Sequence, residues 1–249
     1  MQLRIGTAGW SIPRSEAAAF PGEGQHLERF ARVLHGVEID TSFYRNHRRE
    51  VYERWAAMTP QSFRFAVKLP RSITHDGRLR RARQPLRRFL AEVEGLGQRL
   101  GVLLVQLPPS LAYEARPVRS FFGLMEEEGV ARGRVVVEPR HASWFEPAAE
   151  RALAALRVSR AGADPARCEA AVRPGGWLGD HGDGDGAQIY YRWHGSPRMY
   201  WSAYEPAWLA ERAHEIRQQW SRAKEVWCIF DNTAGGRALG NALAFRASA

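Results

Sequence analysis

Ionisable side chains form short clusters at the ends of several apolar runs. The densest cluster holds Glu138, Arg140 and His141, directly after an apolar run. A carboxylate beside an imidazole forms an acid–base pair that can move protons near neutral pH. Arg192 and His194 repeat this arrangement after a later apolar run. The two clusters predict either catalytic residues or a salt-bridged rim of a sheet.

Lys68 is a further candidate, because lysine is rare in this chain. Of the 36 basic residues only two are lysines, at positions 68 and 224. Lys68 lies within an apolar run, so its ammonium group pairs with Glu38 or Asp40 on a neighbouring strand, binds a phosphate, or acts as a partly desolvated amine. The residues that we expect to bind substrate are Lys68, Arg140, Arg192, Gln106, Trp10, Tyr200, Tyr204 and Asn232.

Carboxylates at other run ends complete the candidate chemistry. Asp231 follows the last apolar run and joins Glu138, His141 and His194 as an expected catalytic residue. The chain has no H-E-x-x-H, C-x-x-C or H-x-H motif, so a divalent metal ion would need ligands that are distant in sequence. The candidate ligands are Glu38, Glu138, Asp164, His194 and Asp231. Residues 180–185 resemble a calcium loop but lack its final glutamate, which favours a solvated loop.

The elements that carry these residues alternate between two patterns. The predicted strands are residues 3–8, 37–43, 63–69, 102–107, 134–138, 158–163, 188–193 and 226–230. The predicted helices are residues 27–34, 50–58, 85–100, 117–127, 147–156, 206–220 and 236–245. This alternation indicates parallel strands joined by helices. We therefore expect an α/β fold, with residues 1–249 forming a single TIM-like (β/α)8 barrel domain that has irregular sixth and seventh connections.

An open dinucleotide-binding sheet is the alternative architecture. It requires a G-x-G-x-x-G turn after the first strand, and residues 6–10 read Gly-Thr-Ala-Gly-Trp instead. In a barrel the carboxyl ends of all strands meet at one mouth, so the candidate residues are expected to gather there. The segment that contains Tyr200 and Tyr204 is the expected lid of this mouth.

Composition limits the class of protein. The chain has 249 residues, 45% of them hydrophobic, which is enough for a core without disulfides. No apolar run approaches the roughly 18 residues of a membrane span, and the first residues lead directly into a strand. With only two cysteines, a cytoplasmic protein that contacts no membrane is expected. The net charge of +9 suits an anionic small molecule or nucleic acid as partner, although the excess of arginine over lysine also fits a GC-rich coding sequence.

Eight motifs together resemble the YecE-like family (domain of unknown function seventy-two). They are residues 5–11, 37–44, 65–68, 73–75, 104–110, 137–144, 191–195 and 230–233. The resemblance implies a TIM-barrel-like fold with its site at the carboxyl ends of the strands, and it implies no particular reaction. Two departures concern the rim of the pocket: residues 12–19 contain no tyrosine, and Pro139 stands where the family usually has an aromatic or aliphatic residue.

Three functional hypotheses remain open from the sequence. The first is an enzyme of hydrolase or isomerase type, doing acid–base or metal-assisted chemistry on a phosphorylated or nucleic-acid substrate at the barrel mouth. The second is a non-catalytic nucleic-acid-binding protein with an arginine-rich, aromatic-lined surface. The third is a protein-interaction scaffold, which would leave the strand-end residues dispersed.

Overall fold

The strands of this chain are organised as two hydrogen-bonded sheets. The structure is a computed structural model that describes residues 1–131, 133–180 and 186–249. The first sheet has the order β2 (Gly36–Ile39), β3 (Arg64–Lys68), β4 (Leu100–Gln106), β5 (Val135–Glu138), β6 (Ser159–Arg160) and β8 (Gly175–Gly176). The second has the order β1 (Gln2–Thr7), β10 (Glu225–Phe230), β9 (Gln188–Trp193) and β7 (Gly162–Asp164). All neighbours are parallel except β6 and β8. The predicted α/β class is confirmed.

The two sheets approach each other in two places, between β6 and β7 and between β1 and β2. On one side β6 and β7 are separated only by Ala161, whose N–H donates to the Val137 carbonyl at 2.9 Å. The predicted strand 158–163 is therefore divided, with one part in each sheet. On the other side Ala8 forms an isolated bridge with Glu38. The backbones here are so close that a Cβ on Gly6 would lie 2.0 Å from a carbonyl oxygen of β2, which explains the glycine.

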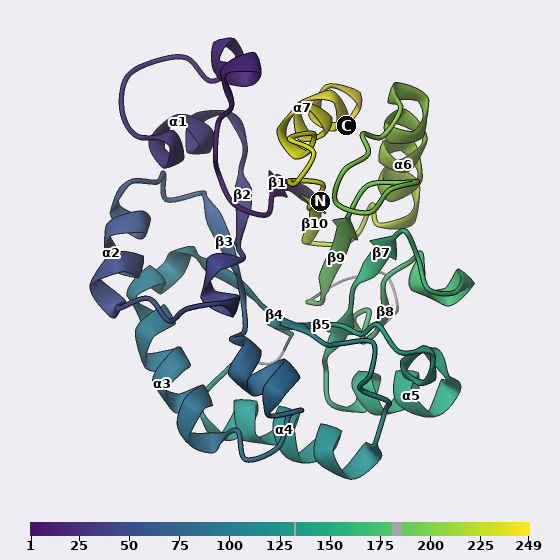
Figure 1. The fold of residues 1–249 in the computed structure, drawn as a ribbon. Coiled ribbons are helices and arrows are strands. Elements are labelled where there is room, and N and C mark those ends of the chain that lie inside the picture. Colours follow the sequence, from purple (N-terminus) through teal and green to yellow (C-terminus); the bar gives the residue numbers. More distant parts are fainter. Residues whose placement is uncertain (132, 181–185) are drawn as a thin grey trace.

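Helices surround the strands in chain order (Figure 1). They are α1 (His26–Val33), α2 (Arg49–Ala57), α3 (Arg83–Val93), α4 (Ala115–Glu127), α5 (Pro147–Ala155), α6 (Pro206–Gln219) and α7 (Ala238–Ser248). None of the helices within the described ranges is long and apolar enough to cross a membrane.

Several predicted boundaries differ from the observed ones, and three examples show how. The strand predicted for 37–43 ends at Ile39, and Thr41–Phe43 form a 3-10 turn. The helix predicted for 85–100 ends at Val93, because Gly97 adopts a φ of +52° in the 3-10 segment that follows. The last helix begins at Ala238 and continues to Ser248. The sixth connection is irregular as predicted, with η6 (Glu169–Ala171) and β8 instead of a long helix.

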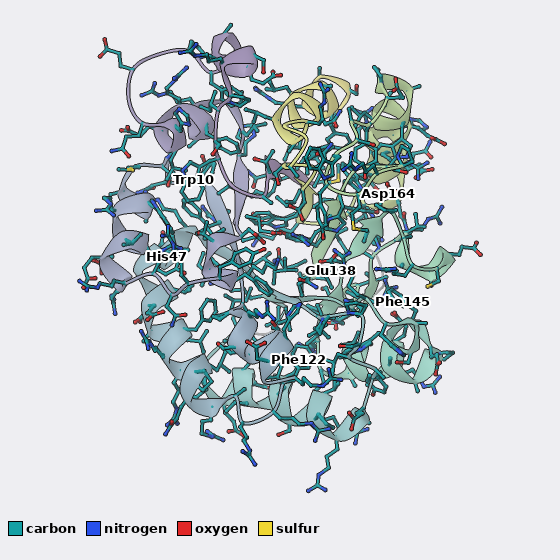
Figure 2. The ribbon with its side chains drawn as sticks, viewed as in Figure 1. Trp10, His47, Phe122, Glu138, Phe145 and Asp164 are labelled. Atoms are coloured by element: carbon teal, nitrogen blue, oxygen red, sulfur yellow. The ribbon has the colours of Figure 1, made fainter. Side chains whose placement is uncertain are left out.

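Alternate residues of β3, β4, β5, β9 and β10 face two different apolar clusters. In β4, Leu103 and Val105 belong to the large cluster that packs against the helices, whereas Val102 and Leu104 belong to a smaller one. The members of this smaller, inner cluster are Ala66, Val102, Leu104, Val136, Ala161, Tyr190, Trp227 and Ile229. They come from both sheets, so the inner faces of the two sheets meet. Figure 2 accordingly places Glu138 near the middle of the molecule and Phe122 farther out.

Candidate active site

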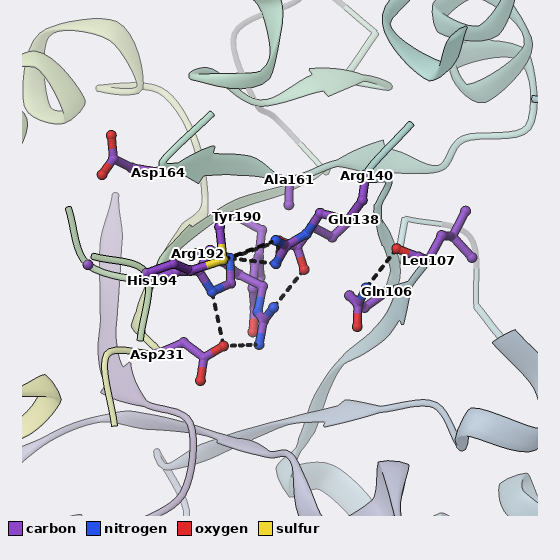
Figure 3. A network of polar contacts seen from close by, with 12 residues as sticks. Gln106, Leu107, Glu138, Arg140, Ala161, Asp164, Tyr190, Arg192, His194 and Asp231 are labelled. Atoms are coloured by element: carbon purple, nitrogen blue, oxygen red, sulfur yellow. Dashed lines mark hydrogen bonds and ion pairs between the residues drawn. The ribbon is translucent and has the colours of Figure 1, made fainter. Parts of the chain in front are cut away.

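The strand periodicity of two directs many of the candidate residues inwards. Glu138 follows the inner residue Val136, and His194 follows the inner residue Tyr190 at an even spacing. Glu38, Lys68, Arg192 and Asp231 occupy equivalent positions on their strands or directly after them. Figure 3 shows Glu138, Arg192, His194 and Asp231 together at the carboxyl ends of strands from both sheets. Glu38 joins them through Arg192.

Arg192 is the centre of this arrangement. Its Nε and Nη2 donate to the two carboxylate oxygens of Glu38 at 3.0 and 2.6 Å, a bidentate pair. Nη1 donates to Glu138 at 2.6 Å, and Nη2 also reaches Asp231 at 3.0 Å. The Tyr190 hydroxyl adds a hydrogen bond of 2.9 Å to Glu38. The Arg192 guanidinium thus pairs with three carboxylates, and the residue is only 1% exposed. It therefore has little capacity left to bind a substrate anion.

His194 lies fully buried between two of the same carboxylates. Its Nδ1 is 3.0 Å from Asp231 Oδ2, and its Nε2 is 2.9 Å from Glu138 Oε1. The Arg140 guanidinium is also 2.9 Å from Nε2 and 2.7 Å from Glu138. An ionised carboxylate only accepts hydrogen bonds, so we assign a proton to Nδ1 that is donated to Asp231. Nε2 faces an acceptor, Glu138 Oε1, as well as a donor, the Arg140 guanidinium, so it donates to Glu138 when it carries a proton and accepts from Arg140 when it does not.

Burial raises the pKa values of the buried carboxyl groups, whereas neighbouring positive charges lower them. Burial raises the pKa of Glu38 above its ordinary value of 4.5, although Arg192 opposes this shift. Burial also acts to raise the pKa of Glu138, but the charges of Arg140 and Arg192 outweigh it and hold that pKa well below 4.5. Arg192 likewise lowers the pKa of Asp231 against the effect of burial. Carboxyl groups whose environments separate their pKa values in this way are typical of acid–base sites.

Lys68 forms a second, smaller group beside this network. Its Nζ lies 2.7 Å from Asp40 Oδ1 and 4.2 Å from the centre of the Phe43 ring. The predicted ion pair with Asp40 is present, and the alternative pairing with Glu38 is not, since Glu38 is bound by Arg192. The Asp40 side chain is 28% exposed, so this pair lies closer to solvent than His194 does.

Some predicted site residues make local contacts away from the network, and these include His141, Gln106 and Trp10. His141 caps the 3-10 turn Ala142–Phe145, where its Nδ1 accepts from the Ser143 N–H. The Gln106 side chain donates to the neighbouring Leu107 carbonyl (Figure 3). Trp10 packs edge to face on Trp55. His141 lies three residues beyond the end of β5 and serves the following turn instead of the site, which sequence spacing alone does not reveal.

Residues 199–204 and Asp164 form the wall next to His194. The Tyr200 ring packs edge to face on the His194 ring with centres 5.5 Å apart, and Tyr200 is 38% exposed. The Tyr204 hydroxyl donates to Asp164 at 2.7 Å, and Asn232 donates to the Ser202 carbonyl. Tyr204 and Asn232 therefore hold this wall in position, while Tyr200 covers the imidazole.

The proposed metal ligands do not meet as a group. No three His, Cys, Asp or Glu side chains within the described ranges are arranged to hold a metal ion. Glu38 and Glu138 bind Arg192, and Asp164 binds Tyr204 instead of facing His194. The loop that resembles a calcium site lies outside the described residues from position 181 to 185.

Two contributors were missed by the sequence reasoning. Tyr190 donates to Glu38, but it stands inside an apolar strand where it looks like core. Met199 places its sulfur 3.9 Å from Arg140 Nη1, and no sequence pattern marks it. The inward parity of Tyr190, two residues before Arg192, is the one signal that would have found it.

Known proteins with similar sequences and folds agree on one family. The chain is 31% identical over 115 residues to the UPF0759 protein YecE of Escherichia coli strain K12, a match that covers 46% of this chain. The match spans only 41% of the length of that relative. A crystal structure of a DUF72 family protein from Thermotoga maritima superposes with a TM-score of 0.77 at 21% identity, covering 99% of this chain and 98% of that one.

A second solved structure gives the same result. A DUF72 family protein from Enterococcus faecalis superposes with a TM-score of 0.75 at 19% identity, covering 99% of this chain and 95% of that one. At these identities the structures show the fold alone. The family described as "Protein of unknown function DUF72" matches residues 4–249. This chain therefore belongs to the DUF72 family.

Proposed function

We propose that this protein is an enzyme that performs acid–base chemistry on an anionic substrate at the carboxyl ends of its strands. The observation that carries the proposal is the position of His194, buried between Asp231 and Glu138 within a network fixed by Arg192. A histidine oriented by a carboxylate at Nδ1 is suited to accept and donate protons at Nε2. Hydrolysis and isomerisation both use such a group.

Arg140 is the residue that we assign to the substrate anion. Its side chain is 9% exposed, and its buried Nε has no hydrogen-bond partner within the described residues. An arriving phosphate or carboxylate would draw this guanidinium away from His194, which would free Nε2 for the reaction. Tyr200 covers the imidazole, so its displacement opens the path to substrate. Lys68 supplies a second positive charge nearer to solvent.

The sequence predicted that Arg192 binds the substrate anion, but in this proposal it positions the carboxylates of the site. Three carboxylates occupy its guanidinium, so it positions Glu38, Glu138 and Asp231 instead of binding substrate. Glu138 in turn holds both Arg140 and His194, and its ionised carboxylate fixes the position of Nε2.

We also propose that the two sheets form one TIM-like (β/α)8 ring. The continuous passage from β6 to β7 through Ala161 and the bridge between Ala8 and Glu38 support closure at both edges. The inner apolar cluster drawn from both sheets supports it as well. A cytoplasmic location is our expectation, and it fits the two free cysteines.

A panel of phosphomonoesters, nucleic acids and sugar phosphates tests the proposed activity. The wild type is expected to turn over at least one member, and His194→Ala and Glu138→Ala are expected to abolish that turnover. The matched control is His214→Ala, because His214 is exposed on α6. Circular dichroism checks that each variant is folded. Turnover that survives in both folded variants, or a wild type inactive on every class, would reject the proposal.

A further inference from the structure

A groove lined by arginines lies between residues 79–83 and helix α4. Its volume is about 640 Å³. The charged residues that line it are Arg80, Arg81, Arg83, Glu114, Arg116, Arg119 and Glu127. No residue of the network around Arg192 contributes to it. The groove is therefore a separate feature from the candidate active site.

The groove nevertheless belongs to the same end of the molecule. Residues 79–83 follow β3 and its π-helical segment Ser72–Asp76, and α4 follows β4. Because β3 and β4 are parallel, both connections leave from the carboxyl ends of their strands. His194 directly follows β9 and Arg140 lies two residues after β5, so the part of the groove formed by residues 79–83 and 114–116 follows the same ends of the strands as the candidate active site.

Three of the arginines carry uncompensated charge. Arg80 pairs with Glu114 at 2.8 Å and Arg83 pairs with Glu127 at 2.7 Å, which joins the two walls. Exposed Arg81, Arg116 and Arg119 have no ion pair or side-chain hydrogen bond with any residue in the described ranges. Positive charges gathered in a concave surface concentrate anions near it.

The backbone adds to this preference for anions. Helices α3 and α4 both begin at the groove, at Arg83 and Ala115, and neither has a side-chain cap. The free N–H groups at these two helix starts favour anions there, whereas the part of the groove at Leu124 and Glu127 borders the carboxyl end of α4. Leu79 and Arg81 adopt left-handed φ values of +63° and +51°, unusual for residues other than glycine. This conformation buries Leu79 while Arg81 stays exposed.

We propose that this groove binds a chain of phosphate groups and so directs a linear polyanion towards the candidate active site. Guanidinium groups match phosphate geometry, and the three free arginines come from two different elements. Helix α4 has 13 residues and is about 20 Å long, so the groove suits several phosphates in a row. The inference rests on the proposed function for the class of substrate, whereas binding in the groove is tested without turnover.

Binding is measured by fluorescence anisotropy at about 50 mM salt, a level at which phosphate contacts are strong. The probes are a labelled single-stranded RNA of about 12 nucleotides and, as competitor, inorganic polyphosphate. The triple variant Arg81→Glu, Arg116→Glu, Arg119→Glu is expected to bind RNA at least about 10-fold more weakly than the wild type. Its plot of log affinity against log salt should be shallower by about 2, since each lost contact to a single strand removes about 0.7.

The matched control reverses three exposed arginines on other elements, Arg14, Arg54 and Arg151, and changes the net charge equally. This control is expected to bind like the wild type. An equal loss in both triple variants would overturn the proposal, because bulk charge would then explain binding. If the glutamate triple variant does not fold, the corresponding glutamine variant replaces it.

The experiment distinguishes RNA from polyphosphate as the ligand, and it distinguishes binding in the groove from catalytic turnover. Polyphosphate that binds while RNA does not still supports the groove and identifies the ligand as polyphosphate. A wild type that binds neither overturns the inference. A wild type that binds the probes in the groove but turns over no member of the substrate panel would remove only the proposed function.

Discussion

At the scale of single residues, Arg192 explains why so many charges are buried together. Leaving a carboxylate unpaired in the interior is costly, and removing one partner of a buried pair typically destabilises a protein by about 3–5 kcal/mol. The guanidinium of Arg192 holds Glu38, Glu138 and Asp231 at once, so each carboxylate is paired. The network fixes His194 in one orientation and leaves Arg140 as its most accessible cation.

Glu138→Gln is expected to make the free energy of unfolding depend less steeply on pH in the acidic range. The pKa of Glu138 is held well below 4.5 in the folded protein, so its contribution to stability is present above about pH 4.5 and lost as the pH falls towards its folded pKa. Glu38 has a raised pKa and acts in the opposite direction. Urea unfolding of wild type and variant from about pH 6 to pH 3 measures the difference.

The variant should be less stable by about 3–5 kcal/mol at neutral pH, and its stability should fall less steeply in acid. The control is Glu50→Gln at an exposed position, which should leave both quantities as in the wild type. A Glu138→Gln variant with the acid dependence of the wild type would show that this carboxyl is not held ionised.

The sequence identified most of the residues of the site but not all of their roles. Strand ends and inward parity are readable, so Glu138, His194 and Asp231 could be predicted. The direction of a side chain in the turn after a strand cannot be predicted in the same way. His141 therefore caps the turn Ala142–Phe145 instead of joining the site. Arg192 resembled an anion ligand because a sequence shows a charge without showing its partners.

At the scale of elements, β1 and β2 approach each other closely at Gly6. A Cβ at position 6 would lie 2.0 Å from the Gly36 carbonyl oxygen, so Gly6→Ala forces the strands apart. We expect a loss of stability of about 1–3 kcal/mol, as for overpacked cores. Chemical denaturation monitored by circular dichroism measures it.

Gly123→Ala is the matched control for this substitution. Gly123 lies within α4, and a Cβ there has no neighbour within 4 Å. Alanine favours a helix over glycine by about 1 kcal/mol, so this variant should be as stable as the wild type or more stable. A Gly6→Ala variant as stable as Gly123→Ala would contradict the close contact between β1 and β2.

The order of helices and strands was predictable because the hydrophobic period changes between them. The division of the strand 158–163 was not, since Ala161 continues the apolar pattern of its neighbours. Its cause is long-range: β6 pairs with β5, whereas β7 pairs with β9. Strand partners that are distant in sequence leave no local signal.

At the scale of the whole molecule, the inner apolar cluster joins the two sheets. Tyr190 and Trp227 come from the four-stranded sheet, and Leu104 and Val136 come from the six-stranded sheet. Loss of one sheet would expose the inner face of the other. We therefore expect a single cooperative transition, in which tryptophan fluorescence and far-ultraviolet circular dichroism coincide across a urea titration. Two separated transitions would mean that the sheets unfold independently.

The whole account depends on the position of one proton, the one on Nδ1 of His194. Nitrogen-15 NMR of the histidine side chains at neutral pH measures it directly, and the His194→Ala variant assigns the signal. We predict that Nδ1 of His194 carries a proton bound to Asp231, and that Asp231→Asn shifts this resonance. A neutral His194 with its proton on Nε2 and a bare Nδ1 would contradict the proposed acid–base site.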